Sequence, residues 1–186
     1  MKRVMKGGAL VSGLLALTGT LLWALSRWSV LLTIAITAGT VFYHVGIRLF
    51  IGCVLDRLLD NRTDPWKGWY QIAPWENVLY EKLRVKQWKK KIPTYDPALF
   101  DPSQHSWTEL AKAMCQAELV HEAGMAASVV PLFFSLWFGA FAVFLLTAVL
   151  AAGYDLLFVV VQRCNRPRVL RLAAREEQRS QHTKTE

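Results

Sequence analysis

Residues 124–161 read GMAASVVPLFFSLWFGAFAVFLLTAVLAAGYDLLFVVV, and Asp155 is the only charged residue among them. As one helix, this stretch would be about 57 Å long at a rise of about 1.5 Å per residue, which is too long for a single membrane span. A helical hairpin fits better. We expect one arm over about 124–138, a turn near Gly139 and a return arm over about 142–163. The stretch therefore predicts a protein that spans a membrane.

Two further apolar runs lie closer to the N-terminus, over about residues 7–25 and 29–55. Basic residues precede the first run, and its C-terminal end weakly resembles a cleavage site, so a signal peptide is one interpretation. The run is long for a signal peptide and a second span follows at once, so we favour a first transmembrane helix. The sequence therefore predicts an all-α, polytopic membrane protein, with about four transmembrane helices in a single domain over 1–186.

The segment between the second and third spans, over about residues 56–123, is polar and basic. We expect an interfacial helical segment here, with one helix opening at Pro74. Another helix is predicted to begin at Trp107, because Ser106 and Glu109 have the spacing of a capping box. Aromatic residues that fit the headgroup level of a bilayer lie in the first part of the segment 56–123, at Trp66, Trp69, Tyr70 and Trp75.

The net charge of the chain is +8, and its basic residues gather in blocks. Four spans place both termini, the segment 56–123 and the tail 164–186 on one side of the membrane. By the positive-inside rule that side is cytoplasmic. We therefore predict a multi-pass protein of the cell membrane with both termini in the cytoplasm. The cysteines are scattered and form no C-x-x-C pair, so we interpret them as reduced residues rather than as disulfides or zinc ligands.

The candidate catalytic stretch is Ala117-Glu118-Leu119-Val120-His121-Glu122, just before the third span. The spacing places Glu118, His121 and Glu122 on one side of a helix. Ionisable groups are costly at the mouth of a membrane segment and usually serve a function there. A histidine held by a carboxylate can deprotonate a hydroxyl, so we predict that His121 is a general base oriented by Glu118. The alternative is a structural hydrogen-bonded pair between helices.

Other polar groups are expected at a similar depth. His44 and Arg48 lie one helical turn apart in the second span, and Asp155 lies about two turns inside the fourth. For Arg48 alone, snorkelling to the interface is the better explanation, and His44 fits a buried histidine with its hydrogen bonds satisfied. A binding role for the pair stays open. Nearby cations would neutralise a phosphate or an oxyanion. The candidate substrate-binding residues are His44, Arg48, Lys86, Trp88, Lys89, Asp155, Arg163, Asn165, Arg166 and Arg168.

Several chemistries lack their sequence signature. There is no G-x-S-x-G elbow, no G-x-G-x-x-G and no P-loop. No histidine is followed by four residues and then Asp, the signature of the soluble-type glycerolipid acyltransferases. Glu118 and His121 match half of a di-iron carboxylate site, but the second half is missing from the sequence. We therefore predict no metal and no resident cofactor.

Three stretches resemble the glycosyl-4,4'-diaponeurosporenoate acyltransferases, small membrane enzymes of the staphyloxanthin-type carotenoid pathway. The stretches are VKQWKKKI at 85–92, AELVH at 117–121 and VQRCNRPR at 161–168, and they occur in matching order within roughly residues 75–175. The resemblance implies that a fatty acyl group passes from a donor such as acyl-CoA to a sugar hydroxyl of a lipid-soluble glycoside.

Two positions depart from the family pattern. Cys164 stands where the pattern has Tyr, and Glu122 stands where the carotenoid enzyme has an apolar aromatic residue. The second departure leaves Glu118 with His121 as the better catalytic pair.

Functions from different classes stay open. The first is an acyltransferase that modifies a glycosylated isoprenoid or another glycolipid, which needs a lateral, lipid-sized cleft ending at His121. The second is a non-enzymatic membrane subunit or scaffold whose basic segment docks on anionic lipid or on a partner. A small membrane methyltransferase is a weaker third alternative. The expected partners are the bilayer, the acyl donor and the glycoside, and not a nucleic acid.

Overall fold

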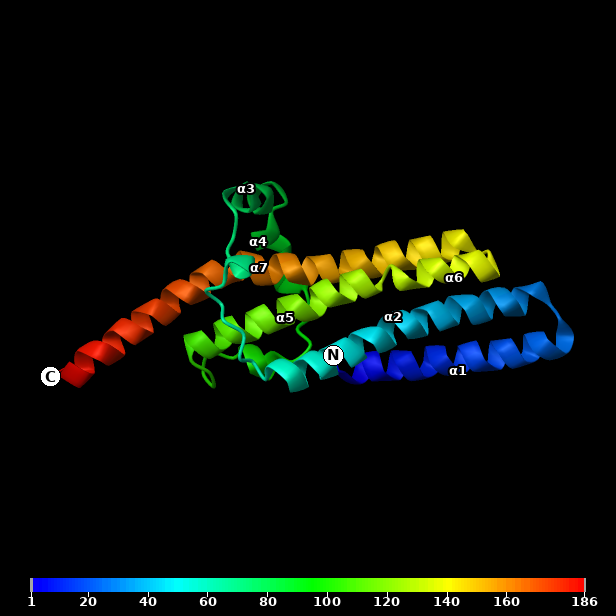
Figure 1. Cartoon of the computed structure of the whole chain (residues 1–186), viewed down its shortest axis with the longest axis horizontal. Coiled ribbons are helices and arrows are strands. Elements are labelled where there is room, and N and C mark those ends of the chain that lie inside the picture. The colour runs from blue at the N-terminus through cyan, green and yellow to red at the C-terminus, as the bar shows by residue number, and fades with distance from the viewer. Residues whose placement is uncertain (1, 186) are drawn as a thin grey trace. The chain divides into compact units, whose positions relative to one another are not determined.

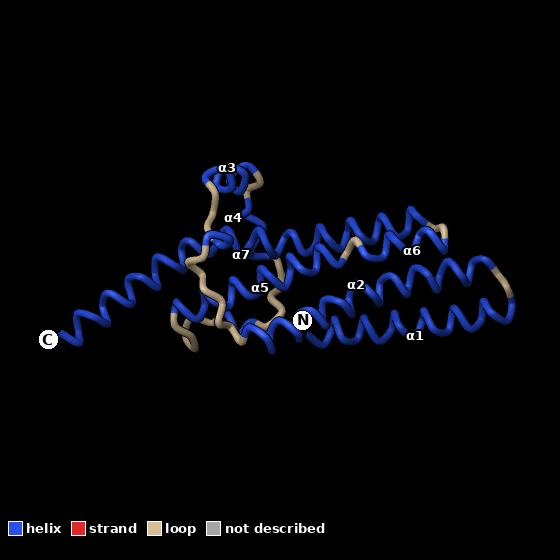
Figure 2. The backbone as a smooth tube through the Cα atoms, in the orientation of Figure 1, coloured by secondary structure: helices blue, strands red, loops and turns tan. Residues whose placement is uncertain are grey.

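The computed structural model describes residues 2–185, and among these it contains helices and loops but no strand. Four helical stretches are long and apolar enough to cross a membrane: Lys2–Ser26, Ser29–Leu59, Trp107–Phe138 and Phe141–Arg179. The predicted all-α membrane fold with four spans is therefore confirmed. Figure 1 shows these helices along the chain, and Figure 2 shows most of the loop backbone in the segment between α2 and α5.

The helices include the apolar runs of the sequence, but α2 and α7 continue past the C-terminal ends expected for their spans, and the third span is divided between α5 and α6. The α-helices are α1 (Lys2–Ser26), α2 (Ser29–Leu59), α3 (Pro74–Lys82), α4 (Val85–Trp88), α5 (Trp107–Ala127), α6 (Val130–Phe138) and α7 (Phe141–Thr185). Short 3₁₀ turns are η1 (Gly68–Tyr70), η2 (Lys89–Lys91) and η3 (Pro97–Phe100). The turn between α6 and α7 uses Gly139 and Ala140, both at positive φ, so the predicted reversal near Gly139 is confirmed. The capping box of α5 also forms, because the backbone N–H of Ser106 donates to Glu109 at 2.9 Å.

The chain divides into two compact units. Unit 1 consists of Met1–Val54 and Glu122–Leu156, and unit 2 consists of Leu55–His121 and Leu157–Glu186. The boundaries fall inside α2, α5 and α7, so each of these helices contributes to both units.

In unit 1, α1 and α2 form an antiparallel hairpin that packs through small residues. A side-chain carbon added at Gly19 would lie 3.3 Å from the Cβ of Ala35, and one added at Gly13 would lie 3.1 Å from the Phe42 ring. Small residues let transmembrane helices approach closely, which increases their van der Waals contact. Many large apolar side chains on these helices are exposed, as expected for a surface that faces lipid.

Unit 2 has a core in which α5 and α7 contribute most of the buried apolar side chains. Hydrogen bonds tie the loop after α2 to α5: the Asn61 backbone N–H donates to Gln116 at 2.8 Å, and the Thr63 hydroxyl donates to the carbonyl of Lys112 at 2.9 Å. The buried apolar residues of this unit are Tyr70, Tyr80, Val85, Leu110, Ala111, Ala113, Met114, Cys115, Phe158, Val159, Leu170 and Ala173.

Helix α3 is inverted with respect to an ordinary surface helix. Glu76 and Tyr80 lie one turn apart on its buried face, whereas Trp75 is 65% exposed and Val78 is 53% exposed. A helix of a soluble protein turns its apolar stripe toward the core. The exposed face of α3 mixes Trp75, Val78 and Leu79 with Asn77, Glu81 and Lys82, so apolar and charged side chains are both available to a bilayer surface. This arrangement agrees with the interfacial segment that the sequence predicts between the second and third spans.

Candidate functional site

The predicted site residues fall into two groups, one in each unit. Unit 1 contains His44, Arg48, Glu122 and Asp155. Unit 2 contains Lys86, Trp88, Lys89, Glu118, His121, Arg163, Asn165, Arg166 and Arg168. Each group contains a partly buried arginine, Arg48 in unit 1 and Arg163 in unit 2, and the two are held differently.

Arg163 on α7 uses all of its N–H donors. Its Nε donates to Glu76 Oε2 at 2.7 Å and its Nη2 to Glu76 Oε1 at 2.6 Å, which makes a forked ion pair. Its Nη1 donates to Glu118 Oε1 at 2.7 Å and to the Trp69 carbonyl at 3.1 Å, and Nη2 also donates to the Gln71 carbonyl at 3.1 Å. Arg163 therefore joins α3, α5 and the loop before α3 to α7. It has no donor left for the phosphate contact that the sequence predicts.

Arg166, one turn further along α7, is fully buried. Its Nη1 donates to the Tyr70 carbonyl at 2.6 Å, its guanidinium carbon lies 5.1 Å from the Tyr70 ring centroid, and its Nη2 pairs with Glu118 Oε2. Both carboxylate oxygens of Glu118 are thus engaged by arginines, whereas the helical spacing predicted His121 as the partner of Glu118. Two glutamates and two arginines form a charge-balanced set, which we call the arginine network: Glu76, Glu118, Arg163 and Arg166.

Glu76 holds its negative charge strongly. The hydrogen bonds from Arg163 lower the pKa of the Glu76 carboxyl to about 2. Burial opposes this change, while hydrogen bonds from the Tyr80 hydroxyl and the Ala73 backbone N–H add to it. Burial and the hydrogen bond to Glu76 raise the pKa of the Tyr80 phenol. Glu76 is therefore a fixed anion at any ordinary pH.

His121 lies on α5, one turn after Glu118, and is half-buried. Its imidazole stacks on the ring of Phe158, with 4.5 Å between the ring centroids and 13° between the planes. Stacking fixes the plane of the imidazole and leaves its nitrogens at the ring edge, where they can meet a polar group. Glu122 is half-buried in unit 1. The predicted catalytic roles of His121 and Glu122 stay predictions.

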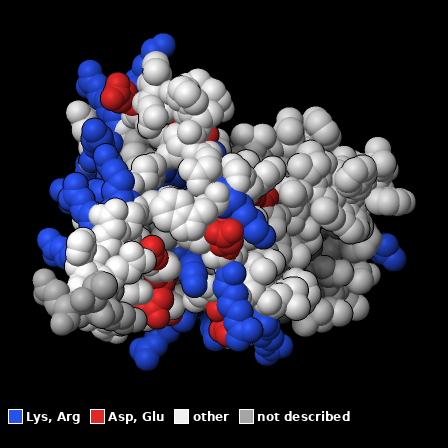
Figure 3. Space-filling model, turned by 60° about the vertical axis from the view of Figure 1, so that its left-hand side comes forward, with Lys and Arg blue, Asp and Glu red and all other residues white. Residues whose placement is uncertain are grey.

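The basic segment contacts α7 through one of its lysines. The Lys89 ammonium donates to the side-chain oxygen of Asn165, and the Trp88 indole donates to the Leu83 carbonyl at 2.9 Å. Lys86 and Arg168 are exposed, and the structure describes no ion pair for either. In Figure 3, Lys and Arg side chains gather over one part of the face, where exposed cations can meet an anionic group.

In unit 1, Arg48 is held inside the protein. Its Nη2 lies 2.5 Å from Asp155 Oδ2, 2.9 Å from Ser128 Oγ and 2.9 Å from the Ala151 carbonyl, and its Nη1 donates to the His44 carbonyl at 2.6 Å. The Arg48 side chain is 11% exposed and that of Asp155 is fully buried. The sequence favoured snorkelling for Arg48 alone. That explanation is wrong here, because four protein oxygens surround the guanidinium.

Two residues that sequence reasoning missed complete this pair. A side-chain carbon at Gly124 would lie 2.8 Å from Asp155 Oδ2, so only glycine leaves room for the carboxylate. Ser128 donates to the Gly124 carbonyl at 2.8 Å while it accepts from Arg48. In unit 2 sequence reasoning likewise missed Glu76, although its position at the start of a predicted helix after a proline was visible.

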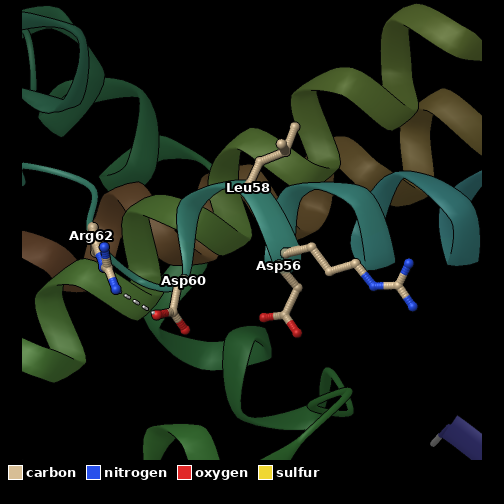
Figure 4. Close-up of a pocket in the computed structure, with 5 residues that line it drawn as sticks. Asp56, Leu58, Asp60 and Arg62 are labelled. Carbon is tan, nitrogen blue, oxygen red and sulfur yellow. Dashed lines mark hydrogen bonds and ion pairs between the residues drawn. The ribbon is translucent and has the colours of Figure 1, made fainter.

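Two surface hollows are lined by residues other than the predicted catalytic residues Glu118, His121 and Glu122. One, of about 370 Å³, is lined by Asp56, Arg57, Leu58, Asp60 and Arg62, and Figure 4 shows the contact between Asp60 and Arg62 within it. The other is lined by Arg175, Gln178, Arg179 and His182. Neither includes His121, so the cleft expected at His121 stays a prediction. No group of metal-binding side chains occurs among the described residues.

Comparison with known proteins places this network within a family. Residues 66–175, more than half of the chain, match the family described as glycosyl-4,4'-diaponeurosporenoate acyltransferase. The chain belongs to this family. The matched range contains the positions of the arginine network and His121, and the resemblance seen in the sequence is confirmed. No curated protein and no solved structure gave a match.

Proposed function

We propose that this protein is a membrane acyltransferase that moves a fatty acyl group from a donor such as acyl-CoA to a sugar hydroxyl of a lipid-soluble glycoside. Its family membership supports acyl transfer in carotenoid biosynthesis. We assign His121 as the general base and Glu118 as the residue that positions α7 beside it. The protein needs no resident cofactor in this scheme.

One observation carries the proposal: three separate stretches that resemble the family converge in unit 2. Lys89 from 85–92 contacts Asn165 from 161–168, and Glu118 from 117–121 binds two arginines of that same last stretch. His121 lies one helical turn from Glu118. A buried frame held by ion pairs next to a histidine fits a preorganised catalytic site.

The chemistry asked of these residues is simple. An imidazole nitrogen of His121 accepts the proton of the sugar hydroxyl as the oxygen attacks the carbonyl carbon of the donor thioester. The bond from carbon to sulfur then breaks, and the proton leaves with the thiolate. The products are an ester on the sugar and a free thiol. We assign the donor phosphates to the exposed cations Lys86 and Arg168, because Arg163 and Arg166 already bind protein oxygens.

The function is tested by incubating purified protein in lipid nanodiscs with radiolabelled palmitoyl-CoA and a total membrane lipid extract. We expect label to appear in a glycolipid that mild alkali releases as free fatty acid, because the new bond is an ester. A matched sample without acceptor lipid should give no such product. If wild-type protein transfers no label to any lipid, the alternative of a non-enzymatic membrane subunit is favoured.

We further propose that the protein lies in the cell membrane with both termini and the segment 56–123 in the cytoplasm. The distribution of basic residues supports this orientation, because all but five of the 22 Lys and Arg residues belong to unit 2. In a cysteine-free background, a single cysteine at position 27 or 139 should react with an impermeant maleimide in intact cells. A cysteine at position 90 should not react, and labelling at this position would contradict the proposed orientation.

A further inference from the structure

His44 is an exception among the buried polar side chains of unit 1. Ser12 and Thr40 donate to backbone carbonyls of their own helices, and Ser128 and Asp155 both bind an arginine. His44 is 6% exposed, yet neither Nδ1 nor Nε2 has a hydrogen-bond partner among the described residues. The sequence left open a satisfied buried histidine and a binding role here. The structure gives the burial without the hydrogen bonds.

An unpartnered imidazole is unfavourable in this position. Leaving a buried polar group without a hydrogen bond destabilises a protein, and in a membrane span no bulk water can replace the missing partner. A leucine or phenylalanine would fill similar space without this penalty. A polar side chain retained at such a place is therefore expected to meet a ligand.

The surroundings define the chemistry of that ligand. The Arg48 guanidinium donates to the His44 carbonyl one turn away, and its charge is already balanced by Asp155. A second cation beside it would be unfavourable, so the imidazole is best accommodated as the neutral form, with one donor and one acceptor nitrogen. A hydroxyl group complements both, because it can donate one hydrogen bond and accept another.

We propose that His44 marks a binding site in unit 1 for a hydroxyl group of a lipid-soluble molecule. The neighbouring Val41 is 41% exposed and Phe42 is 46% exposed, on a helix that is apolar enough to cross the membrane. A ligand therefore reaches His44 from the hydrocarbon region and must itself dissolve in lipid. The glycoside acceptor is one such molecule, and that particular identification rests on the proposed function.

The binding site can be tested without any acyl transfer. The full-length protein, labelled with ¹⁵N-histidine, is placed in phosphatidylcholine nanodiscs and titrated with dodecyl glucoside, with dodecane as the matched probe that lacks hydroxyls. The chain has 4 histidines, so the His44 signals can be assigned from the His44→Gln variant. We expect the His44 ring nitrogens to shift with dodecyl glucoside and not with dodecane. No shift, or the same shift with both probes, overturns the proposal.

Three variants separate a ligand site from a plain core position. His44→Leu should unfold at a higher temperature than the wild type without a probe, and should bind dodecyl glucoside about 10-fold more weakly. His44→Gln, which keeps a donor and an acceptor, should retain part of the affinity. Thr40→Val, a buried control whose hydroxyl bonds within its own helix, should bind as the wild type does. Wild-type affinity in His44→Leu contradicts the proposal, and weakened binding supports it even if no acyl transfer is found.

Discussion

Arg48 in unit 1 and Arg163 in unit 2 are both held inside the protein by carboxylates, but the rest of their donors go to different kinds of acceptor. Arg48 binds Asp155, a serine hydroxyl and two carbonyls, all of which lie on or beside helices. Arg163 binds two glutamates and the carbonyls of Trp69 and Gln71, in and just after the 3₁₀ turn η1.

This difference determines what each arginine is needed for. Helical carbonyls already accept hydrogen bonds from their own helix, so a helix loses little when Arg48 is removed together with its counter-ion. The carbonyls of Trp69 and Gln71 lie outside an α-helical ladder and depend on Arg163 for a charged donor. We infer that the pair in unit 1 is replaceable as a pair, whereas the network in unit 2 supports the backbone around it.

The largest effect is expected at Arg163. Arg163→Ala leaves Glu76 buried without its cation and removes donors from two loop carbonyls, so we expect a loss of about 3–5 kcal/mol in the free energy of unfolding. Arg163→Lys should recover only part, because an ammonium cannot reproduce the fork. The measurement is chemical unfolding in mild detergent. Arg168→Ala, an exposed control on the same helix, should change stability by less than about 0.5 kcal/mol.

A smaller effect is expected for the pair in unit 1, and it should be non-additive. Asp155→Leu alone leaves the Arg48 charge uncompensated in the membrane, whereas Arg48→Met combined with Asp155→Leu removes both charges. The double variant should therefore be more stable than the Asp155→Leu single variant, with a coupling energy of about 1–3 kcal/mol. Additive effects of the two substitutions would show that the contact between Arg48 and Asp155 does not stabilise unit 1.

The smallest effect near neutral pH is the change in stability with pH that comes from ionisation of Glu76. Its folded-state pKa is lowered to about 2, so its contribution to stability is complete above the unfolded value of 4.5 and is lost as the pH falls toward about 2. Stability followed by unfolding from pH 7 to pH 2.5 should fall mainly in the acid part of this range. In Glu76→Gln the fall should be shallower, because the ionising group is gone. An equal acid slope in both proteins would mean that other carboxyls cause it.

The helices could be predicted from the sequence because their signals are local. The turn at Gly139, the capping box at Ser106 and the helix start at Pro74 each depend on residues a few positions apart. The inner contacts could not be predicted in this way. Glu76 and Arg163 are separated by 87 positions, and nothing in the sequence tells Arg163 which carboxylate to choose.

The same limit explains why the sequence pointed to His121, and not to the two arginines, as the partner of Glu118. Helical spacing places His121 within its reach, but spacing along one helix cannot reveal that two arginines of another helix will approach the same carboxylate. Similarly, Gly124 reads as an ordinary small residue of a membrane span. Its function in making room for Asp155 depends on how α5 and α7 pair within unit 1.

The role of His121 as the general base is tested most directly by comparing acyl transfer in the wild type, His121→Ala and the control His105→Ala. We expect His121→Ala to lower kcat by about 10²–10⁴-fold while its unfolding midpoint stays close to that of the wild type, because a base is lost and the arginine network is kept. His105, on the loop before α5, should be replaceable without loss of transfer. Near-normal turnover in His121→Ala would contradict the proposed catalytic site.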